Sequence, residues 1–500
     1  MKLRKKRHKP MHINDITIID DSKLKKAITA AALGNAMEWF DFGVYGFVAY
    51  ALGQVFFPGA SPGIQIIAAL ATFSVPFLVR PLGGIFFGAM GDKFGRQKVL
   101  STTIIIMAVS TFCIGLIPSY AAIGIWAPIL LLLAKLAQGF SVGGEYSGAA
   151  IFVAEYSPDR KRGFMGSWLD FGSIAGFVLG AGVVVLISSI VGEAHFLDWG
   201  WRIPFFIAAP LGIIGLYLRH ALEETPAFQQ HVDKMEKDDR NAIENPPRIS
   251  FTEIAAKHWK SLLVCVGIVI STNVTYYMLL TYMPSYLSHN LNYSEDHGIL
   301  IIIAIMIGML FVQPVIGLTS DRIGRKPFII GGSIGVVALS IPCFILINSS
   351  VIGLIFVGLL VLAVLLNCFT GVMASILPAM FPTNIRYSAL AISFNISILV
   401  AGATPTAVAW LVESTGNLYM PAYYLMVVAV IGLITGLFMK ETANKPLRGA
   451  PPAASDRTEA KELLQETYDN IEQKVEDINA QIADLENKKQ TLVDQHPKLD

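Results

Sequence analysis

Charge is scarce in this chain. Only 15% of its 500 residues are charged, whereas 54% are hydrophobic, and an ordinary soluble domain carries about 25% charged residues. The charges are also unevenly spread, because 49 of the 75 Lys, Arg, Asp and Glu residues lie in 1–26, 219–260 and 440–500. Repeated apolar runs of about 20 residues fill the remainder, which excludes a soluble globular enzyme. The composition indicates a polytopic membrane protein.

Cysteine is scarce too. The four cysteines all lie in apolar runs without a CxxC pair or a Cys/His cluster, so neither a disulfide framework nor a metal site is expected. Because the chain also has no nucleophile–base pair and no Gly-rich phosphate loop, an enzyme is the least favoured class. We expect no cofactor, no metal and no nucleic-acid partner. The basic start from Lys2 to Lys9 is followed by an acidic stretch rather than a cleavage site, so we expect it to be retained.

Twelve apolar runs follow one another along the chain. Each is long enough to cross a hydrocarbon core about 30 Å thick, and helices satisfy their own backbone hydrogen bonds there. The sequence therefore predicts an all-α membrane protein with twelve transmembrane helices in two six-helix bundles. The runs lie near 27–53, 65–90, 99–117, 123–151, 164–190, 203–219, 261–288, 298–318, 327–347, 351–379, 387–412 and 421–439.

Lys and Arg residues lie in every second connection between the runs and in both tails. In the remaining connections, Arg202 is the only Lys or Arg residue. Because Lys and Arg favour the cytoplasmic side, both termini and the central loop are expected to be cytoplasmic. That loop contains Pro246-Pro247 and divides the chain into equal halves, as parallel repeats of transporters do. The predicted segments are an N-terminal segment 1–26, a first bundle 27–220, a linker 221–258, a second bundle 259–440 and a tail 441–500.

A short motif, GxxxD[KR]xG[KR], occurs between the second and third run of each half. Its glycines permit a tight turn and close helix approach, and its acid can pair with basic groups or a helix N-terminus. We interpret it as a conformational latch, because a turn that is merely basic would not need the repeated acid and glycines. The gating positions are Gly88, Asp92, Gly95, Arg96, Gly317, Asp321, Gly324 and Arg325.

Together with four further motifs, this repeat resembles the major facilitator superfamily over nearly all of residues 27–440. The motifs are NAMEWFDF (35–42), QGFSVGGE (138–145), SPDRKRG (157–163) and FPTNIR (381–386). They are similar to the metabolite:proton symporter branch, and the whole chain with its tail is similar to osmoregulatory members. The resemblance implies alternating access, with a cavity lined mainly by spans one, four, seven and ten.

That resemblance also implies import of proline, glycine betaine and related zwitterions with protons, activated by high osmolality, across a bacterial inner membrane. Two alternatives stay open: a proton symporter for a dicarboxylate or other organic acid, and a facilitator-fold membrane sensor. Ionisable groups inside the spans and both gating turns argue against the sensor.

Ionisable groups inside membrane spans are costly unless paired or hydrated, so each is a candidate functional residue. A proton-coupled carrier needs acids and bases that exchange partners during transport. The alternative is fixed ion pairs that hold helices together. Asp170 is the weakest candidate, because it could meet the basic cluster at 160–162. The proton-coupling candidates are Glu38, Asp41 and Glu145, and the charge partners, or ligands of a substrate carboxylate, are Arg80 and Lys135.

A quaternary ammonium group cannot donate hydrogen bonds and is attracted to aromatic faces, each worth about 0.5–2 kcal/mol. Aromatic residues on spans one and seven could form such a cage, although packing or an interfacial belt is the commoner role. The cage candidates are Trp39, Phe42, Tyr45, Asn273, Tyr276 and Tyr277. Four glycines of span five, Gly172, Gly176, Gly180 and Gly182, predict close helix contact.

The tail carries a heptad seam that predicts a coiled coil over about 461–495. We expect it to form a homodimer and to regulate transport, although a solvated or membrane-lying amphipathic helix is the alternative. Membrane lipid, with anionic lipid as one candidate, is the other expected partner. The seam positions are Ile471, Val475, Ile478, Ile482, Leu485, Lys489 and Leu492.

Overall fold

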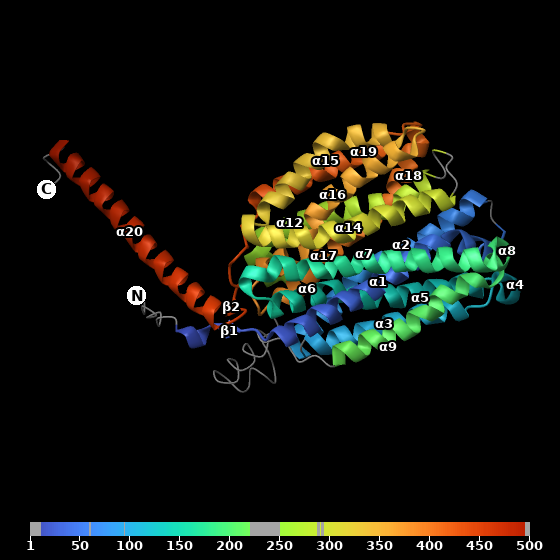
Figure 1. Cartoon of the computed structure of the whole chain (residues 1–500), viewed down its shortest axis with the longest axis horizontal. Coiled ribbons are helices and arrows are strands. Elements are labelled where there is room, and N and C mark those ends of the chain that lie inside the picture. The colour runs from blue at the N-terminus through green and yellow to red at the C-terminus, as the bar shows by residue number, and fades with distance from the viewer. Residues whose placement is uncertain are drawn as a thin grey trace.

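A computed structural model of the chain describes residues 12–59, 62–94, 96–220, 251–287, 291 and 295–495. Long helices, arranged side by side, make up almost all of it (Figure 1). One helix, α20 (Arg457–Gln495), projects away from the bundle, at the same end as the first described residues. We call this end of the bundle the terminal face.

Six spans form the first half, as predicted. The fourth span is broken at Gly143 and Gly144, between α5 and α6. The elements are η1 (Ile13–Asp15), α1 (Asp21–Phe56), α2 (Pro62–Phe94), α3 (Arg96–Leu116), α4 (Tyr120–Ile123), α5 (Trp126–Val142), α6 (Glu145–Tyr156), η2 (Asp159–Lys161), α7 (Arg162–Val191), α8 (Glu193–Asp198), η3 (Gly200–Arg202) and α9 (Ile203–His220).

Six further spans form the second half. The first of them changes from α-helix to π-helix at Tyr277, and π-helical segments often mark functional sites. The elements are α12 (Phe251–Tyr276), η4 (Tyr277–Tyr282), α13 (Met283–Ser285), α14 (Glu295–Ile323), α15 (Lys326–Ile347), α16 (Ile352–Ile376), η6 (Pro378–Met380), α17 (Arg386–Gly402), α18 (Thr404–Thr415) and α19 (Met420–Phe438).

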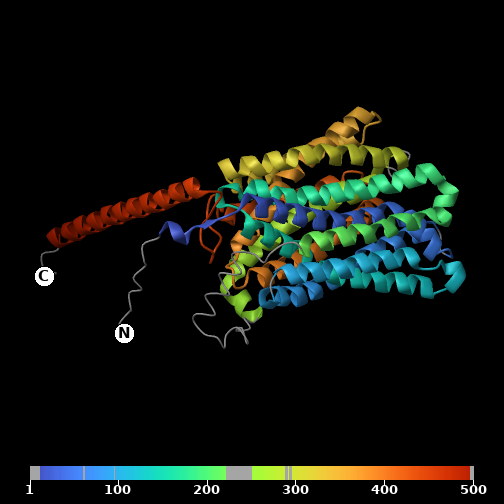
Figure 2. The same cartoon turned by 60° about the horizontal axis from the view of Figure 1, so that its bottom comes forward.

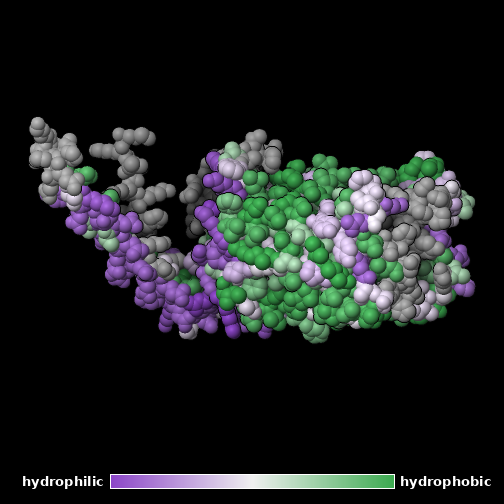
Figure 3. Space-filling model, turned by 90° about the horizontal axis from the view of Figure 1, so that it is seen from above, coloured by the Kyte–Doolittle hydropathy of each residue, from purple (hydrophilic) through white to green (hydrophobic). Residues whose placement is uncertain are grey.

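The lateral surface of the bundle is apolar. Within the described residues, eight helical segments have the length and hydropathy to cross a membrane, and three shorter ones are apolar. Large side chains such as Phe311, Trp410 and Phe438 are exposed on this surface. Figure 3 shows hydrophobic residues over the bundle and hydrophilic ones along α20 and at the terminal face. The prediction of a twelve-helix membrane protein is confirmed.

Glycines permit the close contact of α1 with α7. A Cβ atom at Gly172, Gly176 or Gly180 would lie within 2.7 Å of a carbonyl oxygen of α1. A Cβ atom added at Gly182 would have nothing within 4 Å, so Gly182 takes no part in this contact. The close contact predicted from four glycines therefore extends over three of them.

The two halves meet along two main seams. In one, α7 packs against α14 and α16, and in the other α2 packs against α17. Gly88 of α2 lies in the second seam, where an added Cβ would contact Ser388 and Ala391 at 3.4–3.5 Å. Gly317 of α14 lies in the first, where an added Cβ would be 2.5 Å from the Ser167 hydroxyl oxygen. Both gating glycines thus permit close approach between the halves.

Two segments differ from the predicted boundaries. Most of the predicted linker, 221–250, lies outside the described residues, whereas 251–258 already belongs to α12, which bends at His258. The N-terminal segment is not purely irregular, because β1 (Thr17–Ile18) pairs in parallel with β2 (Ala453–Ala454) of the tail. A strand of two residues has too little periodicity to predict.

The tail helix spans almost the same residues as the predicted coiled coil and stands clear of the bundle in both views (Figures 1 and 2). Its hydrophobic seam positions, from Ile471 to Leu492, are 47–64% exposed in the single chain. Lys489 is exposed as well.

Candidate functional site

A buried ion pair joins α1 to α2. The Arg80 guanidinium Nη2 lies 2.6 Å from Glu38 Oε1, and the two side chains are 2% and 1% exposed. The guanidinium is also 5.6 Å and 5.7 Å from the ring centroids of Phe42 and Phe77. Charged hydrogen bonds in such a low-dielectric site are strong, but each ion depends on its partner to offset its desolvation.

Asp41 and Lys135 are connected through two neutral side chains. The Thr111 hydroxyl donates to Asp41 Oδ2 over 2.7 Å and accepts from Gln138 Nε2 over 3.1 Å. Lys135 Nζ in turn donates to Gln138 Oε1 over 2.5 Å. The acid on α1 and the base on α5 therefore belong to one polar chain through α3, which could pass charge rearrangements between helices.

Glu145 is fully buried at the start of α6. The break at Gly143 and Gly144 separates it from Lys135, so the two lie on different helices. Helix α17 packs at this break: Asn395 Nδ2 donates to the Gly143 carbonyl over 2.6 Å, and the Tyr387 hydroxyl donates to that of Gly144 over 2.7 Å. At this break, two buried backbone carbonyl groups of span four therefore accept hydrogen bonds from the other half.

Four of the six cage candidates lie together where the halves meet. The Trp39 ring centroid is 4.7 Å from that of Tyr276, 5.7 Å from Phe42 and 6.3 Å from Tyr277. Trp39 and Phe42 belong to the first half, and both tyrosines belong to the second. Within the described residues, the indole N–H of Trp39 and the Tyr276 hydroxyl are buried without a hydrogen-bond partner.

The other two cage candidates have different contacts. The ring centroid of Tyr45 is 4.1 Å from Lys135 Nζ, so this ring belongs with the polar chain of Asp41. Asn273 lies one helical turn before Tyr276, and its amide donates to the Val269 carbonyl over 3.0 Å. Asp170 does not meet the basic cluster at 160–162; its carboxylate accepts from the Tyr146 hydroxyl.

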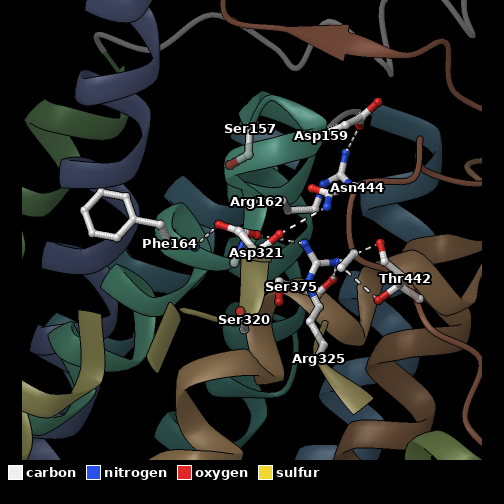
Figure 4. A network of polar contacts seen from close by, with 12 residues as sticks. Ser157, Asp159, Arg162, Phe164, Ser320, Asp321, Arg325, Ser375, Thr442 and Asn444 are labelled. Atoms are coloured by element: carbon white, nitrogen blue, oxygen red, sulfur yellow. Dashed lines mark hydrogen bonds and ion pairs between the residues drawn. The ribbon is translucent and has the colours of Figure 1, made fainter. Parts of the chain in front are cut away.

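The second gating turn connects the two halves at the terminal face (Figure 4). Asp321 at the end of α14 accepts from the backbone N–H groups of Gly163 and Phe164, over 2.6 and 2.8 Å, at the N-terminus of α7. A carboxylate is favoured at a helix N-terminus by the partial positive charge there. Gly324 has φ 97°, which a residue with a side chain rarely adopts.

The first gating turn is only partly described. Its glycine at 88 packs against α17, but Gly95 and the side chains of Asp92 and Arg96 lie outside the described residues.

Three arginines hold the segment 440–456, which we call the strap, against the terminal face. Arg325 donates to the Thr442 carbonyl over 3.0 Å, Arg162 to that of Lys445 over 2.9 Å, and Arg386 to that of Arg448 over 2.8 Å. All three guanidinium groups are buried. Burial lowers the pKa of Arg325 to about 10. The first half supplies one arginine and the second half two, so the strap contacts both.

Further contacts fasten the two ends of the strap. Glu441 accepts from the backbone N–H groups of Arg325 and Lys326, over 3.0 and 2.9 Å, at the start of α15. At the other end, the Ala453 N–H donates to Asp159 over 3.1 Å. Beyond the strap, Arg160 binds Glu462 and Glu466 of α20. Arg386 also forms a buried ion pair of 2.6 Å with Glu155 of the first half.

Family models match both parts of the chain. The sugar (and other) transporter model matches residues 27–453, and the osmosensory transporter coiled-coil model matches residues 455–500. The chain belongs to the sugar (and other) transporter family. This family consists of transporters rather than enzymes, and the chain is a multi-pass membrane transporter with a coiled-coil tail.

Relatives match this transporter over its full length. It is 78% identical to the proline/betaine transporter of Salmonella typhimurium and 77% identical to the glycine betaine/proline/ectoine/pipecolic acid transporter OusA of Dickeya dadantii, covering 100% of each pair of chains. The ectoine/proline transporter ProP of Corynebacterium glutamicum is 41% identical over 90% of this chain and 91% of its own.

Among solved structures, the proton:xylose symporter XylE of the major facilitator superfamily matches with a TM-score of 0.69 at 20% identity. The match covers 85% of this transporter and 98% of that chain, and it confirms the major facilitator fold.

Sequence reasoning missed the strap and its partners. Arg162 and Arg386 belong to the motifs SPDRKRG (157–163) and FPTNIR (381–386), but nothing in these motifs points to their partners. Both halves have an arginine near the end of such a motif, and this repetition was the one sequence feature that could have indicated a shared role. The carbonyl groups that they bind carry no signal in the sequence.

Proposed function

We propose that this transporter is a proton-coupled symporter that imports zwitterionic osmoprotectants, including proline and glycine betaine, across a bacterial inner membrane. The observation that carries this proposal is full-length identity of 77–78% to transporters named for these substrates. Buried acids and bases beside an aromatic cluster between the halves are suited to coupling a zwitterion to a proton.

The aromatic cluster is the substrate site. Faces of Trp39 and Tyr276, one from each half, bind the cationic end of the zwitterion through cation–π attraction. Buried donors without partners favour an incoming acceptor, and the Trp39 N–H and the Tyr276 hydroxyl offer two such donors to the substrate carboxylate. A dicarboxylate would bring a second negative charge to a site where Arg80 is already paired with Glu38.

Alternating access follows from contacts that join the halves. The terminal face is cytoplasmic, and it is closed by Asp321 on the α7 N-terminus, by the Arg386–Glu155 pair and by the strap. Opening toward the cytoplasm requires these contacts to break. Protons are the coupling ion and membrane lipid surrounds the apolar lateral surface; no other cofactor is required.

Osmotic control acts through the tail. Helix α20 pairs with a second copy along its exposed seam, giving a homodimer. Its first turns bind Arg160, and the strap links it to the buried arginines of both halves. A change in α20 therefore reaches the contacts that close the cytoplasmic side.

Substrate choice is tested with the purified transporter in liposomes, by uptake of labelled betaine, proline and a dicarboxylate at several external osmolalities. Betaine and proline should accumulate and the dicarboxylate should not. The variant Trp39→Phe, which keeps an aromatic face but loses the N–H, should raise the KM for betaine less than Trp39→Ala. Uptake of the dicarboxylate alone, or equal KM values for all three forms, would refute the assignment.

Two truncations test the role of the tail. A chain ending at residue 456 keeps the strap and β2 but loses α20, whereas a chain ending at residue 440 loses the strap as well. The chain ending at residue 456 should still transport, but the external osmolality at which uptake is half-maximal should shift. The second should also lose thermal stability, because three buried arginines lose acceptors. An unshifted midpoint in the first would reduce the tail to an oligomerisation device.

A further inference from the structure

Asp170 lies two helical turns into α7, at the seam between the halves, and only 4% of it is exposed. The Tyr146 hydroxyl is 3.2 Å and 3.1 Å from its two carboxylate oxygens. A phenol has one hydrogen, so it can satisfy only one of these oxygens at a time. In the described part of the chain, Asp170 forms no ion pair.

Four other buried acids have cationic or dipolar support. Glu38 pairs with Arg80, Glu155 pairs with Arg386, and Asp321 accepts two N–H groups of a helix N-terminus. Asp41 belongs to the polar chain that ends at Lys135. A buried carboxylate with one phenol donor and no cation is poorly stabilised as an anion, so its neutral acid form suits this site.

Few of the elements around Asp170 bring a charged or titratable group close to it. Glu38 of α1 and the Tyr276 hydroxyl of α12 are close enough to interact electrostatically with the Asp170–Tyr146 pair. Helix α6 contributes Tyr146 and, one residue earlier, Glu145. Helix α16 has no Asp, Glu, Lys or Arg, and α14 has them only at its ends.

The position of Tyr146 couples Asp170 to movement of the halves. Its ring stacks on that of Phe394 of α17, with centroids 4.5 Å apart and an interplanar angle of 11°. Tyr146 belongs to the first half and Phe394 to the second. Rocking of the halves must slide or open this stack, which changes the access of water to the carboxyl group beside it.

We propose that Asp170 carries the transported proton and that Tyr146 is its positioning residue. When the halves open outward, one proton from water joins the carboxylate and forms the neutral acid. The neutral acid persists while the site is closed to water on both sides. When the halves open inward, the acid releases that proton to cytoplasmic water, and Tyr146 keeps its own proton throughout.

This proposal rests on the proposed proton symport and replaces Glu38, Asp41 and Glu145 as the proton carrier. Glu38 then keeps its ion pair with Arg80, and Asp41 keeps its hydrogen bond from Thr111. In Asp170→Asn, substrate exchange across liposomes should continue, whereas a proton gradient should no longer drive substrate above equal concentrations inside and outside. Asp170→Glu should restore part of the accumulation. Ser173→Ala, a buried polar change on the same helix, should accumulate substrate like the wild type.

Tyr146→Phe provides a second readout. Without the phenol donor the carboxylate is less stabilised, so the pH midpoint of uptake should move to higher pH while exchange at acid pH is kept. An Asp170→Asn variant that still accumulates substrate, or an unmoved midpoint in Tyr146→Phe, would overturn the proposal.

A third measurement separates this proposal from the proposed function. The infrared C=O stretching band of a buried carboxylic acid should be present in the wild type at neutral pH and missing in Asp170→Asn, with or without transport. Failure of the wild type to accumulate any substrate would refute symport alone. A band that is unchanged in Asp170→Asn would refute the role of Asp170 alone.

Discussion

Buried charges in this transporter depend on their partners. Arg80 and Glu38 lie on adjacent helices with almost no exposed surface, so neither ion has water to replace a lost partner. Removal of one member leaves an uncompensated charge, whereas removal of both leaves none. Their energetic effect is therefore strongly non-additive, which distinguishes a true pair from two independent polar residues.

Arg80→Gln alone should destabilise the protein by about 3–5 kcal/mol, because it leaves Glu38 buried without its cation. The double variant Glu38→Gln/Arg80→Gln should be more stable than Arg80→Gln. Thermal unfolding in detergent of the wild type, both single variants and the double variant gives the coupling energy. Additive losses would show that the pair has no mutual stabilisation.

Glu441 is a residue whose contribution depends on pH. Burial acts to raise the pKa of its carboxyl group, but four backbone N–H donors together hold that pKa below its usual value. The ionised form is therefore favoured in the folded protein. Its stabilisation is present at neutral pH and is lost as the pH falls through the folded-state pKa.

Glu441→Gln should accordingly lower the Tm at pH 7 and have a smaller effect at pH values below the usual glutamate pKa of about 4.3. Paired melting curves at several pH values measure this difference. Glu472→Gln, at an exposed position of α20, serves as the control and should leave the Tm unchanged. A difference between wild type and Glu441→Gln that grows in acid would contradict the assignment.

At the scale of helices and segments, the sequence predicts the elements that have a repeated pattern of apolar residues. The twelve spans were predictable because each has a long apolar run, and the tail helix because its heptads persist. The break after Val142 was not, since two glycines also fit a continuous helix in close contact. The strap was not predictable either, because it is held through its own carbonyl groups, which every residue has. Of the candidate site, residue types marked the charges and aromatic rings, but only packing shows that Tyr45 lies against Lys135.

The contact of α1 with α7 is tested by two glycines of the same helix. In Gly176→Ala, the added methyl group would lie 1.9 Å from the Ala36 carbonyl oxygen, so α1 and α7 must separate and the Tm should fall by several degrees. Gly182→Ala meets nothing within 4 Å and should keep or raise the Tm, because alanine favours helix. Equal melting temperatures for the two variants would contradict this packing.

At the scale of the whole molecule, two halves and a tail form one coupled unit. The strap contacts both halves and leads directly into α20, whose hydrophobic seam is open to solvent in the single chain. Pairing of two tails would therefore act on the terminal-face contacts of two transporters at once.

Ile478→Lys should disrupt that pairing, because it puts a charge in the hydrophobic seam. Ala480→Lys, two residues away and off the seam, should not. Native mass spectrometry or light scattering of the purified protein should show dimers for the wild type and Ala480→Lys, and monomers for Ile478→Lys. Dimers in all three would place the interface elsewhere.

If transport of a zwitterion is coupled to a proton, a proton gradient alone should drive accumulation of the substrate. Liposomes containing the wild-type protein, acidic outside and at raised external osmolality, should concentrate labelled glycine betaine while their interior acidifies. The acidification should require betaine, and a protonophore should abolish the accumulation. Betaine uptake that only equilibrates across the membrane, or accumulation that continues with the protonophore present, would show that transport is not driven by protons.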